Sequence, residues 1–88
     1  MKEFAFVIGD PLGLHARPAG MLVKEAQRFE SEINAVLERS GKSASLKKVL
    51  AVMGLGAKGG DCLKVTVQGR DEEAAARTIE RWLKEKLG

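Results

Sequence analysis

The chain has 88 residues, of which 44% are apolar and 31% charged, and its formal net charge is +3. This length predicts one domain over residues 1–88 and excludes a core thick enough to enclose a large organic substrate, so we expect a small surface site. The mild positive charge favours acidic or phosphate-bearing ligands but falls short of a dedicated nucleic-acid binder, and the single cysteine, Cys62, excludes an intramolecular disulfide and a cysteine-rich metal site.

Residues 4–8 predict the first strand, because Phe4, Phe6 and Ile8 alternate with residues that face the other side. Five apolar residues are too few for a signal peptide or a membrane span, so the sequence predicts a soluble, cytoplasmic protein. The glycines and proline of residues 9–13 predict a loop.

A helix is predicted after this loop. Ala19, Leu22, Val23 and Ala26 recur at helical spacing. Pro18 suits the first helical turn, where its missing N–H removes no intrahelical hydrogen bond.

The second half of the chain predicts three more strands and two helices. Residues 33–38 and 42–45 read as strands joined by a hairpin, and the apolar residues 46–55 as a short helix before a glycine-rich connector. Residues 63–67 alternate most cleanly of all. Asp71 is expected to cap the last helix, with Glu72 at its positive end and Trp82 in its buried stripe.

The predicted order is therefore β-α-β-β-α-β-α. The alternating strands supply only one apolar sheet face, which the helices must cover. This indicates an α+β fold, a sandwich in which four strands are covered on one face by three helices.

Residues 13–18 (GLHARP) place the only histidine, His15, between a glycine loop and a helix start. The first amides of a helix lack intrahelical acceptors and bind anions such as phosphate. The positive helix end and Arg17 disfavour a protonated imidazole and so favour a neutral, nucleophilic ring. Arg17 offers a planar set of donors to phosphoryl oxygens, and Gly13 permits a tight loop and the close approach of a partner's backbone. The pattern predicts His15 as a phosphoryl acceptor.

Simpler interpretations of these residues stay open. A lone histidine before a helix is commonly a cap or a solvated side chain, and Arg17 can be an ordinary surface charge. Asp10, close to His15 in sequence, either contacts the histidine or forms a loop turn.

Residues 13–19 (GLHARPA) resemble the active-site motif of HPr, the histidine-containing phosphocarrier family of the bacterial phosphoenolpyruvate-dependent sugar phosphotransferase system. The resemblance covers nearly the whole chain, since residues 22–26 with Phe29, residues 41–45, residues 53–56 and the closing strand and helix fall in family order. It implies an open-faced β-sandwich with a four-stranded antiparallel sheet.

The resemblance also implies roles for the site residues. His15 would accept a phosphoryl group on Nδ1 from enzyme I, which draws on phosphoenolpyruvate, and pass it to the EIIA domain of a sugar transporter without any cofactor or metal. Arg17 would stabilise the transferring group, the backbone amides of Ala16 and Arg17 would hold its oxygens, and Gly13 would belong to the phosphate-binding loop. The protein would be a monomer that turns over only with its partners.

Family members dock partners through the face of their first two helices. The residues 46–55 hold more apolar side chains than one buried stripe requires, which independently predicts an exposed apolar patch beside the reactive group. The alternative is that the domain buries them all. The docking face maps to Gly20, Met21, Lys24, Val49, Leu50 and Met53.

One position departs from the family pattern. Many Gram-positive members carry a regulatory serine at the start of the second helix, and that position falls on Lys48 here. Lysine cannot accept a phosphoryl group in this way, so we expect this control to be absent or to use another site.

Two other functions remain as alternatives. Residues 56–59 (GAKG) resemble the GxxG loop of KH domains, which makes a small RNA-binding module a rival from another class. A phosphocarrier of the nitrogen-related branch, or a regulatory protein whose phosphorylated His15 reports status, would keep the same fold. A classical enzyme finds no support, because the sequence lacks a second histidine and a Walker loop.

Overall fold

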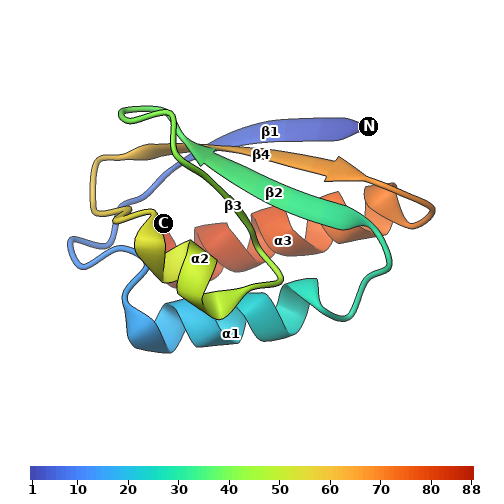
Figure 1. Ribbon diagram of the computed structural model, residues 1–88, viewed down its shortest axis with the longest axis horizontal. Coiled ribbons are helices and arrows are strands. Elements are labelled where there is room, and N and C mark those ends of the chain that lie inside the picture. The colour runs from blue at the N-terminus through green and yellow to red at the C-terminus, as the bar shows by residue number, and fades with distance from the viewer.

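Four strands form one antiparallel sheet in the computed structural model, which describes residues 1–88. The spatial order β1-β4-β2-β3 puts β1 and β3 at the two edges (Figure 1). Both sheet neighbours of β4 run antiparallel to it. The strands are β1 (Lys2–Val7), β2 (Glu32–Leu37), β3 (Ser43–Ser45) and β4 (Cys62–Gln68).

Three helices complete the predicted β-α-β-β-α-β-α order, and all of them lie on one side of the sheet (Figure 1). They are α1 (Ala16–Ala26), α2 (Val49–Gly54) and α3 (Glu72–Leu87). Helix α1 packs against both other helices, while α3 lies across β1 and β4. The predicted α+β fold with one covered sheet face is confirmed. None of the helices has the length and apolar character needed to cross a lipid bilayer.

The register explains which sheet face is covered. Phe6 pairs with Leu63, and Ile33 pairs with Val67, so alternate residues of adjacent strands point together into the core. The core is one cluster of 23 buried residues, to which α3 contributes the predicted Trp82. The opposite face stays open to solvent, and there Val7 is 60% exposed.

Helix α2 is shorter than predicted. We expected a helix over residues 46–55, but it begins at Val49. The amide of Leu46 donates to the Ile33 carbonyl at 2.8 Å, which extends the sheet contact, and the amide of Lys48 closes a turn onto the Ser45 carbonyl at 3.2 Å. The buried Leu46 side chain therefore anchors the approach to α2 and is not part of the helix.

The start of α3 also differs from expectation. Asp71 occupies the N-cap position, but its side chain makes no capping hydrogen bond. Its carboxylate instead accepts hydrogen bonds from the amides of Glu30 and Ser31 and from the Ser31 hydroxyl. The Glu72 carboxylate accepts from the Gly69 amide at 3.1 Å. Asp71 thus ties the turn before β2 to the turn before α3.

Candidate functional site

His15 is the residue from which α1 begins. Its backbone is extended (φ −79°, ψ −177°), and its carbonyl accepts the first helical hydrogen bond, from the Ala19 amide at 2.9 Å. The imidazole makes no capping bond and no other hydrogen bond or ion pair, and His15 is exposed. The His15 side chain therefore does not cap α1, and its ring nitrogens are accessible to a partner.

The backbone at this helix start has unused hydrogen-bond donors. The amides of His15, Ala16 and Arg17 have no acceptor within the protein, and Pro18 has no N–H. The first turn of α1 also contains no acidic residue. Such a group of free amides at the positive end of a helix favours an anion by about 0.3–1 kcal/mol from the helix dipole alone.

Arg17 adds a full positive charge to this helix start. Its side chain is exposed and takes part in none of the ion pairs of the protein, so its guanidinium donors are not committed to a carboxylate. Asp10, the nearest acidic residue in sequence, uses its Oδ1 to accept from the Leu12 amide at 2.9 Å. Of the two alternatives for Asp10, the structure supports the loop turn.

The loop before His15 is held by another segment of the chain. The amide of Leu14 donates to the Ala57 carbonyl at 3.0 Å. Gly13 has φ +62°, and a Cβ there would lie 2.1 Å from the Ala57 oxygen and 2.5 Å from the Lys58 Cα. Only glycine fits this position, and the close approach that it permits is to the chain's own backbone.

The six predicted docking residues lie on α1 and α2, which pack side by side. Among their apolar side chains, Leu50 is the most exposed at 80%, and Met21, Val49 and Met53 are also exposed. Lys24 is exposed and Gly20 half-buried. The predicted exposure of apolar side chains on these helices is therefore present, and the alternative that the domain buries them all is wrong.

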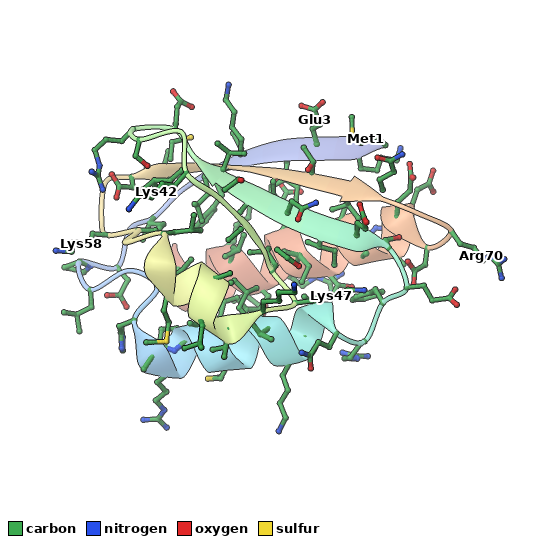
Figure 2. All side chains as sticks on the ribbon, viewed as in Figure 1. Met1, Glu3, Lys42, Lys47, Lys58 and Arg70 are labelled. Carbon is green, nitrogen blue, oxygen red and sulfur yellow. The ribbon has the colours of Figure 1, made fainter.

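Lys47 connects the segment before α2 to the C-terminal end of α1. Its ammonium donates to the Phe29 carbonyl at 2.6 Å, and the Gln27 side chain donates to the Lys47 carbonyl at 3.0 Å. Figure 2 shows Lys47 at the end of α1 that lies away from Lys58. Lys48 is exposed at the start of α2.

Two features near His15 escaped the sequence analysis. Leu12, in the loop that leads to His15, is 68% exposed and adds an apolar side chain to this end of the molecule. The connector at residues 57–61 lies against the His15 loop, whereas the sequence indicated only a link to the next strand. The glycines of the connector could have indicated this contact, because Gly59 approaches the Pro11 backbone too closely for a side chain.

The GxxG-like segment, residues 56–59, overlaps this connector. It lies between α2 and β4 and does not join two helices. Its Ala57 carbonyl and Gly59 amide are bonded to the loop around residues 11–14. A nucleic-acid clamp would need these backbone groups to face a ligand. His15 itself lies on exposed surface.

The chain is similar to known proteins over most of its length. The family model "PTS HPr component phosphorylation site" matches residues 2–85. Phosphocarrier protein HPr of Mycoplasma genitalium is 41% identical over 83 residues, which are 94% of this chain and 93% of the relative.

Solved structures of HPr proteins share the fold. HPr-C-His from Thermoanaerobacter tengcongensis has a TM-score of 0.89 and 35% identity, with 98% of this chain and 94% of that chain covered. A structure described as an HPr dimer from the same organism has a TM-score of 0.75 and 35% identity, with 100% and 99% covered. The exposed histidine at a helix start, the fold and the relatives lead to one conclusion: the chain belongs to the HPr family, the phosphocarriers of the phosphotransferase system.

Proposed function

We propose that His15 is the phosphoryl acceptor of this phosphocarrier, with enzyme I as donor and an EIIA-type protein as the next acceptor. The Nδ1 lone pair attacks the phosphorus, and the new P–N bond forms as the bond to the donor breaks. In the second transfer, a nucleophile of the EIIA-type protein attacks the phosphorus, and the P–N bond to His15 breaks. The observation that carries the proposal is the exposed His15 beside three amides without acceptors and an uncommitted Arg17.

Each group at the helix start has a task in this reaction. The Ala16 and Arg17 amides hold phosphoryl oxygens, the Arg17 guanidinium balances their charge, and Gly13 allows the loop to present these amides. Catalysis by such fixed donors consists mainly of positioning and electrostatic stabilisation. The protein needs no cofactor or metal of its own for this role.

The test is incubation with enzyme I and phosphoenolpyruvate, followed by intact mass measurement. We expect a gain of one phosphoryl group that is lost in acid and retained in alkali, as a phosphohistidine is. The His15→Ala variant should fold normally and gain nothing. Phosphorylation of that variant would show that another residue is the acceptor.

The apolar face of α1 and α2 is proposed to bind enzyme I and EIIA. Leu50→Ser should raise the KM of enzyme I for this protein about 3- to 10-fold, because a central apolar contact is lost. The free energy of unfolding should stay nearly unchanged, because Leu50 is 80% exposed. Val7→Ser, on the open sheet face, is the matched control. Equal effects of the two substitutions on KM would contradict docking through this face.

We further propose that residues 1–88 act as one cytoplasmic domain and as a monomer. The single cluster of buried residues supports one domain, and the dimer known from Thermoanaerobacter tengcongensis makes the oligomeric state worth measuring by sedimentation. The branch is decided by phosphotransfer to several EIIA-type proteins, since a nitrogen-branch or regulatory carrier would reject the sugar-specific ones. Retention on single-stranded RNA at physiological salt would revive the RNA-binding alternative.

A further inference from the structure

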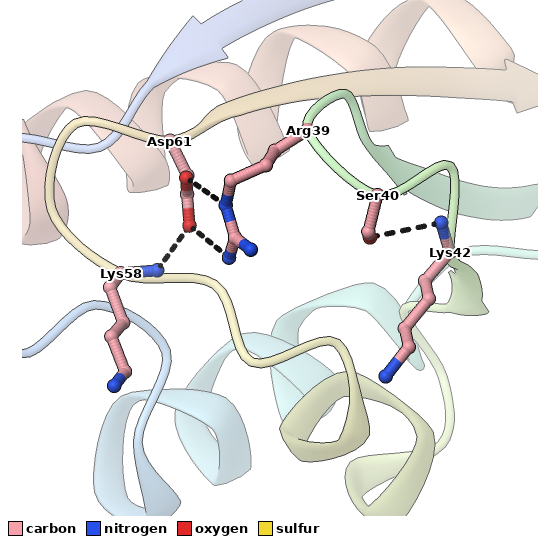
Figure 3. Close-up of polar contacts among 5 residues, drawn as sticks. All are labelled: Arg39, Ser40, Lys42, Lys58 and Asp61. Atoms are coloured by element: carbon pink, nitrogen blue, oxygen red, sulfur yellow. Dashed lines mark hydrogen bonds and ion pairs between the residues drawn. The ribbon is translucent and has the colours of Figure 1, made fainter.

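The carboxylate of Asp61 joins the turn that carries Arg39 to the turn at residues 58–61 (Figure 3). It accepts from Nε and Nη2 of Arg39, at 3.0 and 3.1 Å, and from the Lys58 amide at 3.0 Å. The Asp61 amide donates back to the Lys58 carbonyl at 3.0 Å, so the turn at residues 58–61 is closed from both sides. Only 13% of the Asp61 side chain is exposed.

The backbone of this turn is paired with the loop that leads to His15. The Ile8 amide donates to the Asp61 carbonyl at 2.9 Å, and the Gly60 amide donates to the Ile8 carbonyl at 2.8 Å. At the other end, the Ala57 carbonyl accepts from Leu14, the residue before His15. The two segments touch directly at Gly13 and Gly59, where no side chain would fit.

Arg39 brings the hairpin between β2 and β3 into the same arrangement. It lies in the tight turn that follows β2, where the Gly41 amide donates to the Leu37 carbonyl at 2.8 Å and the Lys42 amide to the Ser40 hydroxyl at 3.2 Å. Its guanidinium binds Asp61 through two donors, the geometry in which Arg–carboxylate pairs are strongest. Arg39 itself is largely exposed, so its contribution is expected to be smaller than that of Asp61.

We propose that Asp61 is a positioning residue for phosphoryl transfer: it fixes the 58–61 turn, which holds the Ala57 carbonyl and through it Leu14 and the start of α1. The inference rests on the proposed role of His15. Asp61 touches neither the phosphoryl group nor His15, and acts only through this chain of backbone hydrogen bonds. A displacement of a reacting group by about 1 Å can lower the rate about 100-fold. Partial loosening of the His15 loop is therefore expected to lower the rate about 10-fold.

A purely structural role predicts something different. If Asp61 only stabilised the fold, replacing it would lower the free energy of unfolding while the folded protein reacted at its usual rate. A positioning role instead lowers kcat for phosphorylation by enzyme I with KM unchanged, because the docking face on α1 and α2 is untouched.

The experiment compares Asp61→Ala with Glu80→Ala. Both remove one carboxylate, but Glu80 pairs only with Lys84 on the surface of α3, at 3.6 Å. At a temperature where both variants are folded, we expect Asp61→Ala to lower kcat about 10-fold with KM within about twofold. Hydrogen exchange at the Leu14 amide should accelerate about 10-fold in the same variant. Glu80→Ala should change neither quantity.

Two further single variants, Asp61→Asn and Arg39→Ala, keep the inference testable if Asp61→Ala folds poorly. Asp61→Asn retains an acceptor for the Lys58 amide, so its kcat should fall less than that of Asp61→Ala. The kcat of Arg39→Ala should also fall less. Adding Arg39→Ala to Asp61→Ala should lower kcat no further. Unchanged Leu14 exchange or unchanged kcat in the Asp61 variants would overturn the inference. Failure of the unaltered protein to accept a phosphoryl group would instead overturn the proposed function.

Discussion

The starts of α1 and α3 are the same structural element put to opposite uses. At α3, the first turn carries Glu72 and Glu73, and the Glu72 carboxylate accepts a hydrogen bond from the Gly69 amide. At α1, the first turn carries no acidic residue and adds the cation Arg17. One positive helix end is balanced by the chain itself, and the other is left for an anion from outside.

This difference supports the choice of the α1 start as the proposed phosphoryl site. A helix start alone does not identify a site, since every helix has one. What distinguishes α1 is that its first turn carries no acidic residue to balance the helix end, and that the proposed nucleophile, His15, stands at the helix start. At α3 the acidic side chains are expected to contribute to stability. Substitutions of the same kind should therefore have different effects at the two helix starts.

Removing the cation from the α1 start should have the largest effect. Arg17→Ala is expected to slow phosphorylation of His15 about 100-fold, the typical cost of losing one preorganised donor to a developing anion. The free energy of unfolding should change by less than about 0.5 kcal/mol, because Arg17 is exposed and unpaired. Stopped-flow or quenched phosphorylation by enzyme I measures the rate.

Arg28→Ala is the control for Arg17→Ala. It removes the same charge near the other end of α1, where Arg28 pairs with Glu25 at 2.9 Å. If the two variants slowed phosphorylation equally, overall charge and not the helix start would govern the reaction.

Giving α1 the carboxylate that α3 possesses should reduce the rate by a smaller factor. Ala16→Asp places a negative charge beside the phosphoryl position, and a repulsion of about 1–2 kcal/mol slows phosphorylation about 10-fold. Stability should stay within about 0.5 kcal/mol, because the gain from the helix dipole offsets the lost helix propensity of alanine. Ala16→Asn has nearly the same shape without the charge, and a rate as low as that of the aspartate variant would refute the electrostatic explanation.

The α3 end should respond to pH through stability and not through phosphorylation. The Ser31 hydroxyl, together with the Glu30 and Ser31 amides, lowers the pKa of Asp71 from its usual range. A carboxyl whose pKa is lower in the folded than in the unfolded protein stabilises the fold above about pH 4. That contribution is lost as the pH falls through the folded-state pKa.

Thermal unfolding between pH 7 and pH 3 measures this contribution. Asp71→Asn should lower the melting temperature at pH 7, and the difference from the unaltered protein should shrink toward pH 3 while phosphorylation at pH 7 is unchanged. Asp61, whose pKa is lowered to about 2 by Arg39 and the Lys58 amide, is present in both proteins and cancels in the comparison. A difference that is constant with pH would exclude the Asp71 charge as its source.

Local patterns in the sequence sufficed for most of the fold. The alternation at residues 63–67 predicts β4 to within one residue at each end, and the predicted start of α1 at the proline turn is correct. The proposed histidine site also rests on a local pattern, because Gly13, His15 and Arg17 are neighbours in the chain. Periodicity is a local property, which explains why most helices and strands could be predicted.

The remaining features depend on partners that are distant in sequence. Leu46 is not helical because its amide is bonded to Ile33, and Asp71 does not cap α3 because Ser31, 40 residues away in sequence, claims its carboxylate. The support of the His15 loop by Ala57 is of the same kind. No local pattern encodes such contacts, and only the folded arrangement reveals them.

The most direct test follows the backbone amides of both helix starts by NMR as enzyme I and phosphoenolpyruvate phosphorylate the protein. The amide protons of Ala16 and Arg17 should move downfield and exchange more slowly with solvent, because each acquires a phosphoryl oxygen as acceptor, while those of Glu72 and Glu73 should stay in place. A phosphorylated protein whose Ala16 and Arg17 amides do not respond would contradict the account.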